Sequence, residues 1–257
     1  MSATTARSAF TRVFPRPLPV LGMLHLKGDG AGDVLDRARR EAALLAECGV
    51  DGLVVEDYYG TVDDVESVLT WLAAAQLPTP YGVNVLDDGL ASFRLADAYG
   101  ASFVQMDSIS GHLAPTDDEE FAAQIAEARA ASSAVLLGGV RFKYQPVKSG
   151  NPLDVDLRTA MGRCDAVVVT GDGTGMETSQ EKIKQFREIV GPGFPLVVGA
   201  GVTAEAVGAA FSHADAAIIG SSLKDTGAAD GEISGPRVLA LMEVVARLRT
   251  QAPGDPT

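Results

Sequence analysis

Two stretches of sequence, LVVGAGVT at residues 196–203 and AIIGSSL at residues 217–223, each run an apolar strand directly into glycine. Turns of this kind place backbone N–H groups and a helix N-terminus at one end of a parallel sheet, where they stabilise the charge of an anion. In a (β/α)8 barrel this is the phosphate site that follows strands 7 and 8. The predicted phosphate-binding residues are Gly199, Gly201, Gly220, Ser221 and Ser222.

The rest of the chain alternates short apolar runs with longer helical patterns, which is typical of βα units and a parallel sheet. No GxGxxG follows the first strand, and this disfavours the alternative of a doubly wound open sheet. We therefore predict an α/β fold, a single-domain (β/α)8 TIM barrel over residues 18–250. Its eight predicted strands cover residues 20–25, 53–57, 81–86, 103–107, 135–143, 166–170, 196–198 and 216–219.

A short internal repeat supports a closed barrel. Similar helix-to-strand turns precede each even-numbered strand, as duplication of βα pairs would produce. Chance similarity between turns remains the alternative interpretation. The four turns are GVDG at 49–52, GAS at 100–102, CDA at 164–166 and ADA at 214–216.

Composition limits the partners and the compartment. The 257 residues leave room for one barrel, and a formal charge of −13 repels nucleic acid and anionic membranes. Two cysteines without CxxC spacing, and no apolar run of about 18 residues, predict a cytoplasmic protein. We expect a phosphorylated small-molecule substrate and a homo-oligomer, because barrels associate through exposed apolar helix faces.

The two ends are expected to lie outside the barrel. Residues 1–17 carry Arg7, Arg12 and Arg16 with no acidic residue, and they end in a proline-rich segment. This composition resembles that of a transit peptide, but we favour a flexible N-terminal arm. Residues 251–257 are predicted to be a disordered tail.

Five consecutive predicted strands end in polar side chains, which a barrel would direct to its C-terminal mouth. Strand alternation predicts that Glu56 faces the lumen and Asp57 does not, and that Arg141 and Lys143 share a face. The predicted catalytic residues are Glu56, Asp107, Lys143 and His25. The predicted substrate-binding residues are Asn84, Gln105, Arg141, Thr170, Asp172 and Thr174.

Glu56 and Asp107 are expected to have different roles in catalysis. Glu56 ends an apolar strand, so burial should raise its pKa toward neutrality and suit it to act as a general acid or base. Its alternative role is structural, in an ion pair with Arg141 or Lys143. Asp107 would hold a ribose hydroxyl or stabilise a developing oxocarbenium ion, or would simply cap the following turn.

Lys143 and His25 complete the predicted catalytic set. Lys143 follows Gly138 and Gly139, which should leave room for a ligand close to the backbone. Such a lysine can neutralise a phosphate, polarise a carbonyl or form a Schiff base, or it can be an ordinary exposed loop lysine. His25 would act as a proton shuttle or as a metal ligand, but the three histidines lack the spacing of a transition-metal site. We predict no cofactor; an Mg2+ held by Glu56, Asp107 and a substrate phosphate is the alternative.

The glycine-rich segment TGDGTGMETS at residues 170–179 follows the sixth strand. It lacks the Gly-Lys-Ser/Thr ending of a Walker A loop. We expect it to form a mobile wall over the substrate that completes the phosphate site of the two glycine turns. The hydroxyl groups of Thr174, Thr178 and Ser179 would bind the ligand or cap the next helix. Ordinary turn chemistry at helix caps is the alternative.

The chain resembles the BtpA/SgcQ family of predicted TIM-barrel proteins over nearly all of its predicted strands. The resemblance implies a barrel but little about the reaction, because members are named for photosystem I biogenesis and for a predicted nucleosidase. The chain departs from the family pattern at KGDG (27–30), Asp57, MDS (106–108) and Gly139-Val140, all near the expected catalytic face. These differences imply an altered substrate. The matching segments are GMLHL (22–26), GVDGLVVED (49–57), GVNVL (82–86), GASFV (100–104), VVTG (168–171) with Thr174-Gly175, GAGVT (199–203) and GSSLK (220–224).

Taken together, these features predict an enzyme that acts on a phosphorylated sugar or nucleotide. Cleavage or transfer at the glycosidic bond of a ribose phosphate is the leading hypothesis. An isomerase or aldolase-type lyase that uses Lys143 is the first alternative. A non-catalytic assembly protein, as the photosystem name suggests, is the second.

Overall fold

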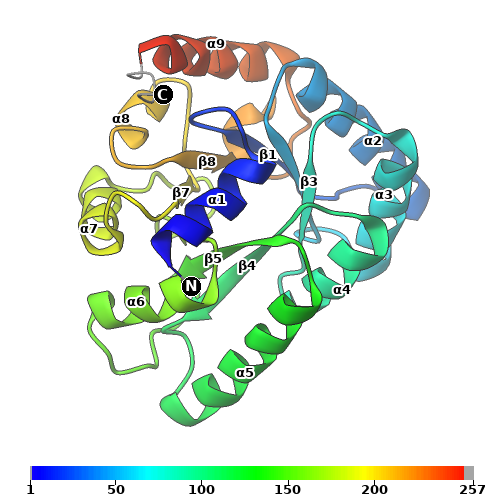
Figure 1. Ribbon diagram of the computed structural model, residues 1–257. Coiled ribbons are helices and arrows are strands. Elements are labelled where there is room, and N and C mark those ends of the chain that lie inside the picture. Colours follow the sequence, from blue (N-terminus) through cyan, green and yellow to red (C-terminus); the bar gives the residue numbers. More distant parts are fainter. Residues whose placement is uncertain (1, 252–257) are drawn as a thin grey trace.

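The computed structural model describes residues 2–251 and shows a closed barrel of parallel strands in the order β1 to β8 (Figure 1). The predicted fold class and all eight predicted strands are confirmed, with differences of a few residues at their ends. The strands are β1 Val20–Leu24, β2 Gly52–Glu56, β3 Tyr81–Asn84, β4 Phe103–Ser110, β5 Val135–Val140, β6 Ala166–Val169, β7 Leu196–Gly199 and β8 Ala216–Ile219.

Helices on the outside of the barrel connect successive strands (Figure 1). Several begin at side-chain caps; Thr61 and Asp64, for example, form a reciprocal capping box at the start of α3. No described helix is both long and apolar enough to cross a membrane. The helices are α1 Ala3–Val13, α2 Ala31–Glu47, α3 Val62–Ala75, α4 Gly89–Tyr99, α5 Pro115–Ala131, α6 Leu153–Arg163, α7 Gln180–Val190, α8 Val207–Ala210, the 3-10 helix η1 Ser221–Leu223 and α9 Gly235–Gln251.

The strands bury apolar side chains on both faces, which produces two separate hydrophobic clusters. The larger cluster lies between the barrel and its helices. The smaller one fills the barrel interior, where Met23, Val54 and Phe103 alternate with residues of the outer cluster. His25, Glu56 and Gln105 lie two residues after Met23, Val54 and Phe103, respectively. Alternation therefore directs these three side chains to the mouth.

The N-terminal segment differs from the expected flexible arm. Residues 3–13 form α1, and Phe10 and Phe14 are buried in the same cluster as the barrel interior. The Phe14 ring meets the Phe103 ring edge-on, with 5.2 Å between centroids. Phe10 and Phe14 are spaced i, i+4, which places both rings on one face of the helix. This spacing is the sequence signal that the segment has a buried face. The predicted tail lies outside the described residues, except for Gln251, which ends α9.

Three aspartates of the internal repeat tie the N-terminal ends of neighbouring strands together. Asp51, Asp165 and Asp215 each accept a hydrogen bond from a backbone N–H at the start of the preceding strand. Each also forms an ion pair with an arginine: Arg249, Arg129 and Arg187, respectively. The repeat predicted from the turns thus reflects a repeated structural role at the N-terminal end of the barrel.

The glycines of β5 do not leave the expected space for a ligand. A side chain at Gly138 would meet the Ile109 side chain, and one at Gly139 would lie 1.9 Å from the backbone oxygen of Asp107. β4 contains a register shift between Met106 and Ser110, and this brings its backbone close to β5. The two glycines therefore permit the close packing of two strands.

Removing the ring of Phe14 should destabilise the protein because α1 would no longer close the barrel interior. We expect Phe14→Ala to lower the free energy of unfolding by about 3 kcal/mol. Urea denaturation followed by circular dichroism measures the change. Ser8→Ala, at an exposed position of the same helix, is the matched control. Equal stability of the two variants would show that α1 does not close the barrel.

Candidate functional site

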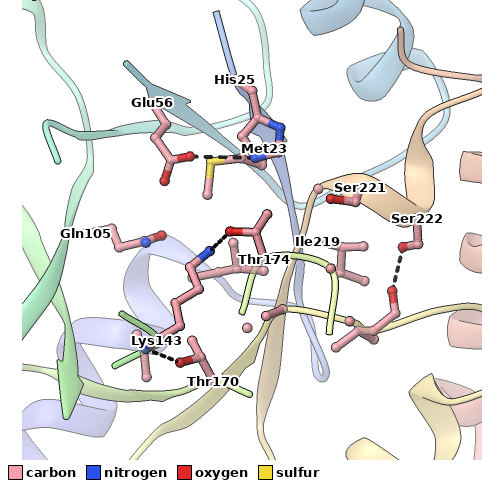
Figure 2. A pocket seen from close by; sticks show the side chains of 18 of the residues that line it. Met23, His25, Glu56, Gln105, Lys143, Thr170, Thr174, Ile219, Ser221 and Ser222 are labelled. Carbon is pink, nitrogen blue, oxygen red and sulfur yellow. Dashed lines mark hydrogen bonds and ion pairs between the residues drawn. The ribbon is translucent and has the colours of Figure 1, made fainter. Parts of the chain in front are cut away.

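A cavity opens at the C-terminal ends of the strands, where the predicted catalytic side chains and glycine turns face each other (Figure 2). It contains about 520 Å3 of empty space, including space open to solvent. All five predicted phosphate-binding residues line it. The other predicted site residues in its lining are His25, Glu56, Gln105, Lys143, Thr170 and Thr174.

Strand register explains why the polar residues of the first four strands lie together. Glu56 pairs with Asn84 across β2 and β3. The register of β1 with β2 extends to place His25 beside Glu56, and that of β3 with β4 extends to place Asn84 beside Gln105. One row of polar side chains therefore crosses four neighbouring strands.

Glu56 is almost fully buried, with 3% of its surface exposed. Asn84 Nδ2 donates a hydrogen bond to Glu56 Oε1 at 2.9 Å. Burial, followed by the nearby charge of Asp107, raises the pKa of Glu56 to about 8. Glu56 therefore retains its proton at neutral pH, as a general acid requires.

His25 is held in one tautomer by a carbonyl from a distant segment. Its Nδ1 lies 3.1 Å from Ala229 O, and because a carbonyl only accepts, Nδ1 carries the proton. Burial, followed by the nearby Lys224 ammonium, lowers the pKa of His25 to about 3. Its unprotonated Nε2 lies 3.6 Å from Glu56 Oε2, so a basic nitrogen faces a protonated carboxyl group.

The carbonyl that orients His25 belongs to residues 224–233, which we call the β8 loop. Lys224 is buried and its Nζ donates to Gly231 O at 3.1 Å. From α2, Arg37 also donates to Gly231 O, and Glu41 Oε1 accepts from Ile233 N. These interactions fasten the β8 loop behind His25.

Asp107 and Glu56 share one donor. Asn84 Nδ2 also donates to Asp107 Oδ1 at 3.1 Å, and Gln105 Nε2 donates to the same oxygen at 3.4 Å. Burial raises the pKa of Asp107, while the hydrogen bond from Asn84 and the charge of Lys143 lower it. The charge on Asp107 in turn helps to raise the pKa of Glu56, so the two carboxyl groups are suited to different roles.

Lys143 reaches the cavity from the loop after β5. Its Nζ donates to Thr174 Oγ1 at 3.0 Å, and its backbone N–H donates to Thr170 Oγ1 at 3.0 Å (Figure 2). Two tyrosines also bind Thr174: the Tyr58 hydroxyl donates to its Oγ1, and the Tyr144 hydroxyl accepts from its backbone N–H. Two segments, Tyr58 after β2 and residues 143–144 after β5, therefore hold the glycine-rich loop, residues 170–179, over the cavity.

The glycine turns after β7 and β8 meet under this glycine-rich loop. Ala200 and Gly201 adopt positive φ angles of 63° and 66°, and a side chain at Gly201 would lie 2.3 Å from the backbone of Glu177. On the other side, Ser221 lies next to Gly175. Ser222 Oγ donates to Val202 O at 2.5 Å, which links the two turns. Backbone and hydroxyl groups thus surround one end of the cavity.

Four predicted site residues do not line the cavity: the substrate-binding candidates Asn84, Arg141 and Asp172, and the catalytic candidate Asp107. Asn84 and Asp107 lie behind the lining, where they bind Glu56 and Gln105. Arg141 and Lys143 do not share a face, because β5 ends at Val140 and Arg141 has a φ of 47°. Arg141 Nη2 instead forms an ion pair with Asp156 of α6 at 3.0 Å. Asp172 is an exposed residue of the glycine-rich loop.

Sequence reasoning missed several residues of the site. Tyr58 and Tyr144 directly follow the predicted polar strand ends, and this position is the signal that would have found them. Ala229 carries no such signal, because only its backbone oxygen acts. Within residues 2–251, no group of three or more His, Cys, Asp or Glu side chains is arranged to hold a metal ion. The Mg2+ alternative stays a prediction.

Comparisons with known proteins agree with the fold and identify relatives. The model of the BtpA family matches residues 13–247. An uncharacterized protein of Thermococcus kodakarensis is 32% identical over 256 residues, which cover 90% of this chain and 96% of the relative. The photosystem I biogenesis protein BtpA of Synechocystis sp. is 28% identical over 270 residues, 93% of this chain and 92% of its own.

A solved structure has the same fold at much lower sequence identity. Phosphoribosyl anthranilate isomerase from Thermus thermophilus superposes with a TM-score of 0.60 and 14% identity, covering 90% of this chain and 100% of the isomerase. Identity this low shows a shared barrel fold and nothing about the reaction.

The raised pKa of Glu56 should appear in the pH dependence of stability. The folded protein holds this proton more tightly than the unfolded chain, whose pKa is near 4.5. The stabilisation is complete below that value and is lost as the pH rises through about 8. Between about pH 5.5 and 8.5, wild type should lose a few kcal/mol relative to Glu56→Gln.

Urea denaturation of both proteins across this pH range measures the difference. Because the amide introduced by Glu56→Gln does not titrate, the difference between the two profiles reports the titration of Glu56, including its coupling to Asp107 and His25. Parallel pH profiles of the two proteins would mean that Glu56 has the pKa of an ordinary exposed carboxylate.

Proposed function

Because this chain belongs to the BtpA family and carries an acid–base pair and an anion site in one cavity, we propose that it is an enzyme acting on a phosphorylated sugar. The observation that carries the proposal is that Glu56, Lys143 and the glycine turns after β7 and β8 line the same cavity. Catalysis on a phosphate ester requires an acid–base group and a phosphate-binding group within the length of one substrate.

The phosphate group would bind at the turns after β7 and β8. There the first N–H groups of η1 have no partner inside the helix, and Ser221 adds a hydroxyl group. Lys143 is the cation in the lining of the same cavity. The net charge of −13 disfavours anion binding overall, so the affinity for phosphate should depend on Lys143 and the N–H and hydroxyl donors of the turns.

Cleavage at the glycosidic bond of a ribose phosphate fits the two carboxyl groups best. Glu56, protonated at neutral pH, would donate its proton to the leaving group as the glycosidic bond breaks and its electron pair leaves with that group. The carboxylate of Asp107 would stabilise the positive charge on the sugar. Water would then add to the sugar carbon and return a proton to Glu56.

One observation favours an isomerase or aldolase-type lyase as a second candidate. Lys143 Nζ lies in the cavity and is held by a single neutral partner, Thr174 Oγ1. An amine in this position can attack a substrate carbonyl to form a Schiff base, with loss of water and with Glu56 as proton carrier.

Substitutions in the two halves of the cavity should separate binding from chemistry. Ser221→Asp should weaken the binding of inorganic phosphate and ribose 5-phosphate by about 100-fold or more, because it places a negative charge in the anion site. Glu56→Gln should keep phosphate affinity within about threefold and lower turnover by about 100-fold or more, because it removes the transferable proton. Isothermal titration calorimetry and sugar release from ribonucleoside monophosphates measure the two effects.

Ser212→Asp is the matched control, because it adds the same charge at an exposed position. Unchanged phosphate binding in Ser221→Asp would contradict the anion site. A protein that binds no phosphate and keeps its cellular role in both variants would be an assembly protein.

Borohydride treatment in the presence of a sugar phosphate distinguishes the two reactions. A Schiff base on Lys143 would be reduced to a stable adduct that mass spectrometry assigns to this residue. The glycosidic mechanism predicts no adduct, with Lys182 as an internal control for non-specific labelling. An adduct confined to Lys143 would replace the glycosidic mechanism with the lyase or isomerase mechanism.

A further inference from the structure

We infer that Gln105 Oε1 accepts a hydrogen bond from a ring hydroxyl of the substrate and so selects a fully hydroxylated pentose phosphate over its deoxy analogues. This inference rests on the proposed function and adds the substrate class to it. Gln105 lies on β4, on the side of the cavity opposite the glycine turns (Figure 2).

The orientation of the Gln105 amide is set by its neighbour. Its Nε2 donates to Asp107 Oδ1 at 3.4 Å, so its Oε1 is directed away from that carboxylate. Figure 2 shows the amide extending into the cavity between Glu56 and Lys143. Only 3% of the residue is exposed, and Oε1 accepts no hydrogen bond from any part of the chain that the structure describes.

The amide of Asn84 and the ammonium of Lys143 donate to other acceptors, and neither donates to Gln105 Oε1. Asn84 Nδ2 donates to both Glu56 and Asp107. Lys143 Nζ donates to Thr174. A buried amide oxygen without a donor is costly, so the ligand is the natural source of the missing donor.

The proposed substrate class supplies this donor as a neutral O–H group. Gln105 lies two strands from Glu56, with Asn84 between them. A sugar whose reacting carbon lies at Glu56 therefore places the hydroxyl of a neighbouring ring carbon within reach of β4. A ligand ammonium would serve the oxygen equally well, but a phosphorylated sugar offers hydroxyl groups at this distance from its reacting carbon.

An analogue without this hydroxyl leaves the buried Gln105 Oε1 without a donor. Sites of this kind reject such analogues strongly, because the buried polar group loses its partner. Phosphate recognition should not change, because the glycine turns lie across the cavity on β7 and β8.

Calorimetric titration with ribose 5-phosphate, its 2-deoxy and 3-deoxy analogues, and inorganic phosphate tests the inference. Wild type should bind one deoxy analogue about tenfold or more weakly than ribose 5-phosphate. Gln105→Met, which keeps the side-chain length but removes the amide, should lose the same factor for ribose 5-phosphate. The variant should bind that deoxy analogue as tightly as it binds ribose 5-phosphate. Its affinity for inorganic phosphate should match that of wild type.

Gln124→Met, at an exposed position of α5, is the matched control and should behave as wild type. Thermal unfolding should show Gln105→Met to be folded, because it replaces a buried amide that lacks a full set of partners. Equal affinity for ribose 5-phosphate in Gln105→Met and wild type, or additive losses for variant and analogue, would overturn the inference alone. Failure of wild type to bind any phosphate compound would overturn the proposed function and this inference with it.

Discussion

The site depends on the closure of β1 against β8. Val20, Leu21 and Gly22 pair with Ala217, Ile218 and Ile219, and this joins the first strand to the last. Closure brings the His25 ring so near to Gly220 that a side chain at Gly220 would lie 2.8 Å from it. An open sheet would keep the acid–base residues of the early strands apart from the glycine turns of the late ones. The barrel brings both into one cavity, because all strands run in parallel and end at the same face.

Within that cavity, burial acts on Glu56 and His25 in opposite directions. It raises the pKa of the carboxyl group to about 8 and lowers that of the imidazole to about 3, because a desolvated group is more stable uncharged. The pair is therefore neutral at physiological pH, with its proton on Glu56. With their ordinary pKa values of 4.5 and 6.5, the same two residues would form an ion pair between those pH values, and Glu56 would be a carboxylate at neutral pH. The cavity thus supplies an acid where an exposed pair would supply a carboxylate.

Segments other than the strands support this arrangement at both ends of the barrel. At one end, α1 closes the interior with Phe10 and Phe14. At the other, the β8 loop orients His25, and α2 fastens that loop through Arg37 and Glu41. The glycine-rich loop covers the glycine turns after β7 and β8 and binds Lys143 through Thr174. These segments determine how far the cavity is closed, while the barrel alone determines where it lies.

The sequence by itself determined the fold class, the eight strands and most of the cavity lining. Strands, turns and alternation are local properties, so Glu56, Lys143 and the turns at Gly201 and Ser221 were predictable from periodicity and glycine positions. Strand alternation predicted the wrong side-chain direction where the strand had already ended. At Arg141 a positive φ turns the side chain toward α6. Only the tertiary structure decided which tautomer His25 adopts, because its partner Ala229 is 204 residues away. It also decided that Gln105 has an unpaired oxygen, because hydrogen bonding and desolvation depend on every group that folding brings near an atom, whatever its position in the chain.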